Sequence, residues 1–195
     1  MKKDIILAGV GGQGILSIAA VIDYAALSLG YKVKQAEVHG MSQRGGAVQS
    51  HLRISDKEIY SDLIGLSGAD LIISVEPMEC LRYTPYLSDK GWIVTSRDCY
   101  KNIANYPEEE SLYAQIEQLP KVVSVDAEKL AREAGSGKAS NIVMLGVAAP
   151  FLGIPVERFK KAIEAIFAEK GQKIIDINLR AFDAGLACSE KMKKE

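Results

Sequence analysis

The sequence predicts an α/β fold: a doubly wound, mostly parallel, Rossmann-like sheet with helices on both faces and a helical C-terminal third. An apolar run that begins at Ile5 enters a turn rich in glycine, as a buried strand that leads into a helix does. Further apolar segments alternate with helical stretches, which is the pattern of parallel strands linked by crossover helices. From Val156 onward the apolar residues recur with helical spacing.

Strands are expected where short apolar segments end beside polar residues or glycine. After the first strand, the expected ranges are 32–38, 47–54, 70–75, 91–96 and 121–125. Most of these segments are almost continuously apolar, as strands covered on both faces are. Apolar and polar residues alternate in 47–54, so this strand is expected to be half exposed and to pair with 58–61 as a hairpin at the sheet edge.

The connections between the strands give weaker signals. Residues 98–110 have no apolar period and are expected to form a surface excursion before a short helix over 111–119. Glu76 follows an apolar strand and precedes Pro77, a pair that suits a helix start, where a carboxylate favours the helix dipole. Ligand binding is the alternative role for Glu76.

The segment 135–140 is similar to a phosphate-binding loop but fails the comparison. A Walker motif needs glycine where Arg132 stands and serine or threonine where Ala139 stands. An ATPase is therefore excluded, and a helix start with Ser140 as its cap, or contact with a partner, is expected instead.

Length and charge restrict the classes of protein that the chain can represent. With 195 residues, 48% of them hydrophobic, it can bury a full core as one domain over 1–195. A formal net charge of −1 gives no electrostatic footprint for nucleic acid or an anionic membrane, so neither partner is expected. No apolar run reaches the roughly 18 residues of a membrane span, and the first residues lead straight into a strand, so a cytoplasmic protein is expected.

The cysteines are too few and too far apart for a local metal motif. Cys80, Cys99 and Cys188 form no C-x-x-C pair, so no familiar motif holds an iron–sulfur cluster or a structural zinc ion. An odd number of cysteines also argues against a disulfide framework. If the protein takes part in redox chemistry, its electron carrier is expected elsewhere.

The first candidate site is the glycine turn, which matches G-x-G-x-x-G at Gly9, Gly11 and Gly14, with Gly12 and Gln13 between the last two. In that pattern the first glycine allows a sharp turn, the second admits a pyrophosphate, and the third allows close packing of helix and strand. Unpaired N–H groups at the helix start then face the anion. A purely structural turn is the alternative, because any tight connection from strand to helix favours glycine.

Glu37 extends this pattern toward a nucleotide. It lies 23 residues after Gly14, near the separation of roughly 20 residues at which dinucleotide-binding folds place a ribose-binding carboxylate. A free-standing NAD-dependent dehydrogenase is therefore one hypothesis. Against this hypothesis, the sequence shows no obvious substrate domain and no catalytic tyrosine–lysine pair.

The second candidate site is the polar segment between the second and third expected strands. Its proposed binding residues are Ser42, Gln43, Arg44, Gly45 and Gly46. Arg44 is the first choice, because a guanidinium grips phosphate or carboxylate at two points. The same arginine would suit a subunit interface, together with Met41. His39 is a candidate general acid or base, and a polar loop without a ligand is the alternative for the whole segment.

Two long motifs carry a resemblance to a known family. The segments GVGGQGILS at 9–17 and EVHGMSQRGGAVQS at 37–50 together resemble the gamma-type domain of 2-oxoacid:ferredoxin oxidoreductases, most closely that of the indolepyruvate type. The resemblance continues through 74–77 and 141–146 and so covers nearly the whole chain.

The resemblance implies a non-redox subunit of a larger enzyme that holds no cofactor by itself. A partner alpha subunit would carry thiamine diphosphate, Mg and iron–sulfur clusters, decarboxylate a 2-oxoacid, and pass electrons to ferredoxin, with coenzyme A as co-substrate. The composition agrees, because the chain has no Gly-Asp-Gly motif for the metal and diphosphate of thiamine diphosphate. For the indolepyruvate type, the substrates would be aryl pyruvates. A purely structural partner, whose glycine motifs bind nothing, is a third hypothesis.

Overall fold

The computed structural model describes residues 1–40 and 45–192, with side chains as far as Glu190. The strands are β1 (Lys2–Val10), β2 (Lys32–His39), β3 (Ala47–Ser55), β4 (Ala69–Ser74), β5 (Leu87–Ser96) and β6 (Val122–Val125). The α-helices are α1 (Ile15–Leu27), α2 (Pro77–Arg82), α3 (Glu109–Glu117), α4 (Ala127–Ala134), α5 (Ser140–Leu152), α6 (Val156–Ile166) and α7 (Gln172–Met192). Short 3₁₀ turns are η1 (Thr84–Tyr86), η2 (Gly137–Ala139) and η3 (Ala168–Lys170).

The strands form one sheet in the order β2-β3-β1-β4-β5-β6. Strands β1, β4, β5 and β6 pair in parallel, while β3 lies antiparallel between β1 and β2. Only β3 therefore runs against the other strands of this sheet. The carboxyl ends of β1, β2, β4, β5 and β6 meet at one edge, where open α/β sheets bind ligands.

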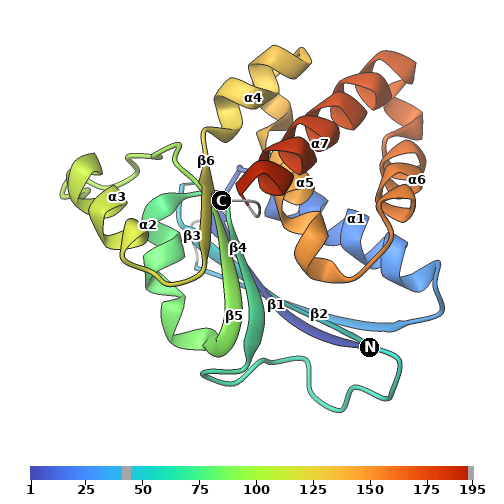
Figure 1. The fold of residues 1–195 in the computed structure, drawn as a ribbon, viewed down its shortest axis with the longest axis horizontal. Helices are drawn as coiled ribbons and strands as arrows, with labels where there is room; N and C mark the ends of the chain where they lie inside the picture. The colour runs from blue at the N-terminus through green and yellow to red at the C-terminus, as the bar shows by residue number, and fades with distance from the viewer. Residues whose placement is uncertain (41–44, 193–195) are drawn as a thin grey trace.

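Helices cover both faces of the sheet, as the sequence predicts (Figure 1). Helices α1, α4, α5, α6 and α7 contribute to the larger core on one face, and α2 and α3 cover the other face. The period of two in 47–54 correctly places Val48, Leu52 and Ile54 in the larger core, but the expected half exposure is wrong, because His51 on the other face is also buried. The mostly parallel, Rossmann-like α/β fold class is thus confirmed.

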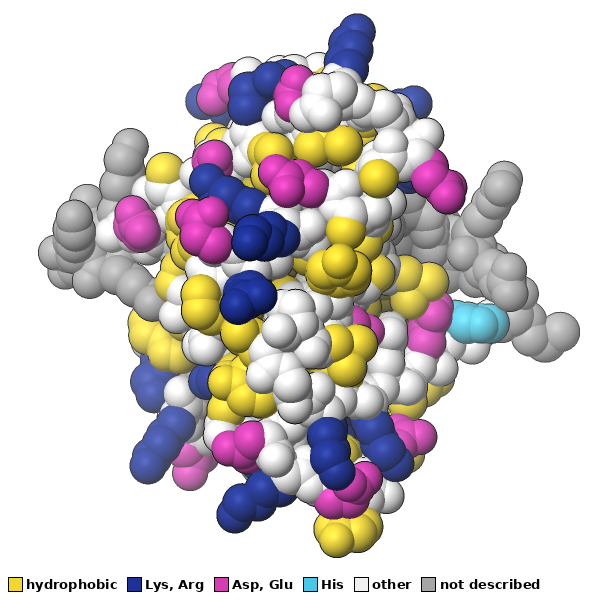
Figure 2. Space-filling model, turned by 90° about the vertical axis from the view of Figure 1, so that its right-hand side faces the viewer, with side chains coloured by type: hydrophobic (Ala, Val, Ile, Leu, Met, Phe, Trp, Pro, Cys, Tyr) yellow, Lys and Arg dark blue, Asp and Glu magenta, His cyan; other side chains and the backbone are white. Residues whose placement is uncertain are grey.

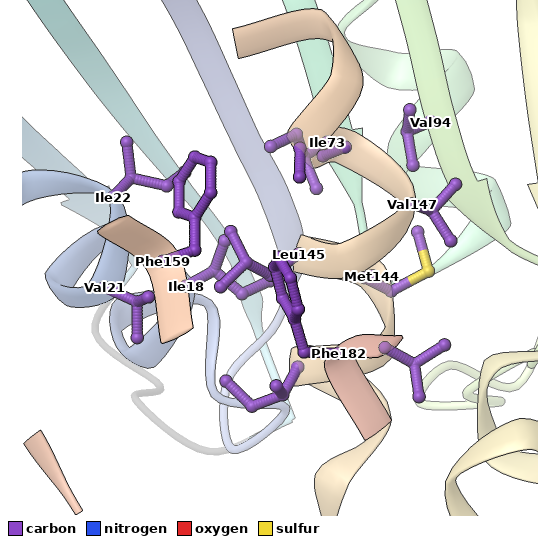
Figure 3. Packing of buried hydrophobic residues seen from close by; sticks show 14 of the residues in the cluster. Ile18, Val21, Ile22, Ile73, Val94, Met144, Leu145, Val147, Phe159 and Phe182 are labelled. Atoms are coloured by element: carbon purple, nitrogen blue, oxygen red, sulfur yellow. The ribbon is translucent and has the colours of Figure 1, made fainter. Parts of the chain in front are cut away.

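Helix α5 is the centre of the larger core and is buried on nearly every side. Its side chains Met144, Leu145 and Val147 point among residues of α1, α6, α7 and the sheet (Figure 3). Two glycines let α5 and α7 approach closely. A Cβ on Gly146 would lie 2.1 Å from the carbonyl oxygen of Phe182, and one on Gly185 would lie 2.1 Å from that of Val143. The backbones of α5 and α7 are therefore in direct contact.

The expected pairing of 47–54 with 58–61 is wrong. Strand β3 pairs instead with β1 on one side, where Ala47 lies opposite Val10, and with β2 on the other, where Ser55 lies opposite Lys32. Residues 58–61 form no strand, and Arg53 holds this connection by donating to the carbonyl oxygens of Ser61 and Leu63 at 3.0 and 3.2 Å. The strand is therefore inside the sheet, because its second edge is filled by the preceding strand.

Two expected helix starts are corrected and one is confirmed. Helix α3 begins at Glu109, before the expected start at residue 111. Ser140 is the first residue of α5, whose N-cap is Ala139, because the 3₁₀ turn η2 already leads the chain into the helix. Glu76 is the N-cap of α2, and its side chain accepts a hydrogen bond from the backbone N–H of Glu79 at 2.8 Å.

Candidate functional site

The glycine turn connects β1 to α1 at the carboxyl edge of the sheet. Gly12 and Gly14 have φ values of 105° and 81°, in the left-handed region that favours glycine. Gly14 is the N-cap of α1 and offers no side chain to the first backbone N–H groups of the helix. The first turn also carries no acidic residue. Among the described residues, the N-cap therefore provides no side-chain acceptor for the start of α1, as in helix starts that bind anions.

Gln13 holds the turn in place through its side chain. Its Oε1 atom accepts a hydrogen bond from the N–H of Val10 at 2.7 Å, and its Nε2 atom donates to the carbonyl oxygen of Val75 at 3.4 Å. The amide thus ties the end of β1 to the end of β4. Because both ends of the amide are engaged within the chain, the side chain of this predicted binding residue shapes the turn.

The structure gives two of the glycines tasks that differ from the predicted ones. Gly9 lies inside β1, where a Cβ would be 2.4 Å from Cγ2 of Val75, so it permits close packing and does not turn the chain. A Cβ on Gly14 would lie 2.6 Å from Nδ2 of Asn141, so Gly14 permits α1 to approach the start of α5 rather than a strand. The sharp turn itself falls at Gly12.

The second candidate loop lies directly beside the glycine turn. The N–H of Gly11 donates to the carbonyl oxygen of Gly46 at 2.8 Å, and the N–H of Gly45 donates to that of Gly11 at 3.2 Å. Asn102 fixes the same loop from the other side, since its Nδ2 atom donates to the carbonyl oxygen of Gly45 at 2.7 Å. Gly11 and Gly45 are 34 residues apart in sequence, so these contacts bring the two predicted sites side by side. The other predicted binding residues of this loop, Ser42, Gln43 and Arg44, lie outside the described residues, as does Met41.

A hollow of about 440 Å³ lies between the glycine turn, the first turn of α1 and the end of β2. Its described lining comprises Val10, Gly11, Gly12, Gly14, Ile15, Leu16, Glu37, His39 and Val48. Glu37 and His39 lie on the same face of β2, two residues apart. The Nδ1 atom of His39 is 2.9 Å from the carbonyl oxygen of Gly40, which can only accept, so Nδ1 is the donor in this contact. The hollow thus combines backbone donors with a carboxylate and an imidazole.

The position of Glu37 differs from that in a dinucleotide-binding βαβ unit. In such a unit the strand after the first helix lies next to β1. Here β3 lies between them, which moves β2 away from β1 by two strand spacings, about 9–10 Å. Glu37 still borders the hollow, but in this described part of the sheet β2 is not adjacent to β1, as the dehydrogenase hypothesis requires.

A second hollow, of about 460 Å³, lies on the other side of the glycine turn, beyond the ends of β4 and β5. Its lining includes Gln13, Asp98, Glu128, Lys138 and Ser140. Asp98 is the organising residue, because its Oδ2 atom accepts from the hydroxyl of Ser96 at 2.6 Å and from the N–H of Glu128 at 2.8 Å. The carboxylate thereby caps the start of α4.

Sequence reasoning missed Asp98, Asn102 and Lys138 as residues near the site. The segment after β5 carries no motif, and its composition indicated a surface excursion. One signal was present, since Asp98 follows an expected strand at its carboxyl end, where polar residues of an α/β fold converge.

Buried Glu76 anchors the segment that carries Asn102. Its Oε1 atom accepts a hydrogen bond from the hydroxyl of Tyr106 and another from the N–H of Tyr100 at 3.4 Å. Burial, followed by the hydrogen bond to Glu76, raises the pKa of Tyr106. The phenol therefore stays protonated as the donor, and the segment is tied to the end of β4 as well as to the second loop.

The fold and the site define an α/β protein with a glycine-rich turn and an adjoining loop at the carboxyl edge of its sheet. The family described as "Pyruvate ferredoxin/flavodoxin oxidoreductase" matches residues 4–188, and the chain belongs to this family.

Relatives and a solved structure agree with this assignment. The chain is 38% identical over 201 residues to the "Indolepyruvate oxidoreductase subunit IorB" of Pyrococcus horikoshii, covering 98% of this chain and 98% of that protein. It is 30% identical over 187 residues to the "Ketoisovalerate oxidoreductase subunit VorA" of Methanothermobacter marburgensis, covering 95% of this chain and 36% of that longer protein.

The structure described as "2-oxoglutarate:ferredoxin oxidoreductase from Magnetococcus marinus with 2-oxoglutarate, coenzyme A and succinyl-CoA bound" has the same fold. The TM-score is 0.76 at 22% sequence identity, over 97% of this chain and 31% of that chain. Within the described residues of the present chain, no helix is both long and apolar enough to cross a membrane.

Proposed function

We propose that this chain is the non-redox subunit, of the beta type, of a thiamine diphosphate-dependent indolepyruvate:ferredoxin oxidoreductase. With a catalytic partner chain it converts an aryl 2-oxoacid and coenzyme A into an acyl-coenzyme A, CO₂ and reduced ferredoxin. Family membership and the 38% identity to a protein named as an indolepyruvate oxidoreductase subunit support the reaction and the substrate class.

One structural observation carries the proposal at the level of the site. The glycine turn and the second loop meet through reciprocal hydrogen bonds between Gly11 and the pair Gly45 and Gly46, and the resulting edge borders a hollow of about 440 Å³. Backbone N–H groups at the start of α1 suit the diphosphate of coenzyme A. Glu37 suits a ribose hydroxyl, because a carboxylate accepts hydrogen bonds but repels phosphate. Arg44 would add a bidentate contact to a phosphate.

The redox equipment is assigned to the partner. Cys80 lies in α2, Cys99 follows β5 and Cys188 lies in α7, and within the described residues no three metal-ligating side chains come together. Burial raises the pKa of the Cys80 thiol to about 12, which disfavours the thiolate that ligates iron. These residues do not fit an iron–sulfur cluster. The chain's own part is therefore to bind and orient the phosphate-bearing substrate, and it is inactive alone.

The test is co-expression with the thiamine diphosphate-bearing chain of the same organism, followed by size-exclusion chromatography and assay of ferredoxin reduction with indolepyruvate. We expect a stable complex whose reduction of ferredoxin depends on coenzyme A. Arg44→Ala is expected to impair this activity or the assembly of the complex. Calorimetric titration of the isolated chain with coenzyme A and with NADH distinguishes the proposed subunit role from the dehydrogenase hypothesis. Tight NADH binding with turnover of a 2-hydroxy acid, or the lack of any complex, contradicts the proposal.

A further inference from the structure

Helix α1 differs from the other outer helices in what it presents to solvent. Its exposed positions are Leu16, Ala20, Tyr24 and Leu27. The exposed fraction is 48% for Leu16, 47% for Tyr24 and 58% for Leu27. These residues recur at helical spacing and form one line along the helix, which we name the α1 stripe. The opposite face of α1 is buried in the core through Ile18, Val21 and Ile22.

The contrast with neighbouring helices is specific to α1. The exposed positions of α6, which packs beside α1, include Glu157, Lys161 and Glu164. On the side of the molecule that Figure 2 shows, hydrophobic side chains reach the surface between scattered acidic and basic ones. A surface helix normally presents polar side chains to solvent, whereas the exposed line of α1 is apolar, so the α1 stripe is expected to be covered in the working protein.

The stripe is continuous with the candidate site. Leu16 is the first residue of the stripe and also lines the hollow beside the glycine turn. From Leu16 to Leu27 the helix rises about 16 Å, so the stripe runs from the mouth of the hollow toward the opposite edge of the sheet. A molecule that covers the stripe as far as Leu16 would therefore also reach the mouth of the hollow.

The relatives indicate that further protein accompanies this unit. The chain covers 36% of the Methanothermobacter marburgensis relative and 31% of the Magnetococcus marinus chain, so in both proteins the same unit belongs to a longer polypeptide. The occupant of the stripe is therefore expected to be a different polypeptide of the same enzyme.

We propose that the α1 stripe is the docking surface for the thiamine diphosphate-bearing partner chain, which covers it with an uncharged surface of aliphatic and aromatic side chains and reaches the mouth of the hollow. This inference rests on the proposed function. It adds the surface through which the two chains meet.

The test uses substitutions at the end of the stripe far from the hollow. Leu27→Lys and Tyr24→Glu place a charge at exposed positions of the stripe that lie away from the glycine turn. The matched controls are Leu66→Lys and Tyr60→Glu, at residues that are 69% and 91% exposed. Both controls lie in the connection from β3 to β4, which packs through Ile64 into the core on the α2 face.

Sedimentation velocity of each variant mixed with the partner chain measures the dissociation constant. The stripe variants are expected to weaken the complex roughly tenfold or more, as the loss of an apolar interface anchor does, while the controls bind as the wild type. Circular dichroism melts report whether each variant is folded.

The outcomes separate the two proposals. If the wild type forms no complex, the proposed function fails. If the wild type forms a complex and the stripe variants bind equally well, or the controls weaken it equally, the docking surface is wrong. Self-association of the isolated chain that Tyr24→Glu abolishes would assign the stripe to a second copy and overturn the inference.

Discussion

Asn141 donates a hydrogen bond from Nδ2 to the carbonyl oxygen of Gly14 at 3.2 Å, which joins the start of α5 to the start of α1. The contact requires glycine, because a Cβ at residue 14 would lie 2.6 Å from the same nitrogen. The turn that borders the candidate site is therefore held by the most buried helix of the core. Its geometry depends on two helix starts that are distant in sequence.

Gly14→Ala is expected to destabilise the protein more than Gly30→Ala. Both glycines have positive φ, 81° and 78°, so both substitutions carry the left-handed penalty of about 1–2 kcal/mol. Only Gly14 adds a clash, because no atom lies within 4 Å of a Cβ at Gly30. The difference in unfolding free energy, measured by urea denaturation, is expected to be roughly 1–3 kcal/mol. Equal losses would mean that α5 moves away from the turn without cost.

Asp23 is expected to make the protein less stable as the pH rises. Burial raises the pKa of Asp23 to about 7, and its Oδ1 atom is buried without a hydrogen-bond partner among the described residues. Between the model-compound pKa of 3.8 and about 7, the unfolded chain is ionised while the folded chain keeps its proton, so the unfolding free energy falls with rising pH.

Asp23→Asn removes this titration, and at pH 8 the variant should exceed the wild type by roughly 1–3 kcal/mol, because the wild type must then hold a charged carboxylate in a buried place whereas the amide stays neutral. Urea denaturation from pH 4 to pH 8 measures the slope, with Asp89→Asn at an exposed position as control. Parallel curves for Asp23→Asn and the wild type would show that the carboxyl group is ionised in the folded protein.

His51 is expected to act in the opposite direction. Its buried Nδ1 atom accepts the N–H of Ile64 at 3.0 Å, and its ring lies edge-on to Tyr86 with 5.4 Å between centroids. Burial, followed by the charge of Arg53, lowers the pKa of His51. As the pH falls through about 6.5, the unfolded chain takes up a proton that the folded chain refuses, so the unfolding free energy decreases.

His51→Asn keeps an acceptor for Ile64 without the titration, so it should lose less stability than the wild type between pH 7.5 and pH 5. Denaturant titrations at both values measure this, and hydrogen exchange at the Ile64 amide reports the bond itself. His39→Asn, at an exposed position, is the control. A variant that follows the wild-type pH dependence would place the proton uptake elsewhere.

The sequence predicted what local patterns determine and missed what distant contacts decide. The alternation in 47–54 correctly predicted which face of β3 joins the larger core, because the side-chain period belongs to the strand itself, but it did not predict that His51 on the other face is buried too. Its neighbours could not be predicted, since the same pattern fits an edge strand and a strand inserted between β1 and β2. In the same way, the glycine spacing located the turn, whereas the tasks of Gly9 and Gly14 depend on Val75 and Asn141.

The last prediction concerns Asn102, which the sequence did not mark. Its Nδ2 atom donates to the carbonyl oxygen of Gly45, so it positions the second loop against the glycine turn without itself lining the hollow. In the assembled enzyme, Asn102→Ala is expected to raise the KM for coenzyme A about fivefold, the equivalent of one lost hydrogen bond of roughly 1 kcal/mol, with kcat nearly unchanged. Asn102→Asp should have a larger effect, because it places a carboxylate against a carbonyl oxygen. Asn105→Ala, at an exposed position of the same segment, is the control and should leave both constants unchanged. Equal KM values for Asn102→Asp and the wild type would show that the position of the second loop does not affect the binding of coenzyme A.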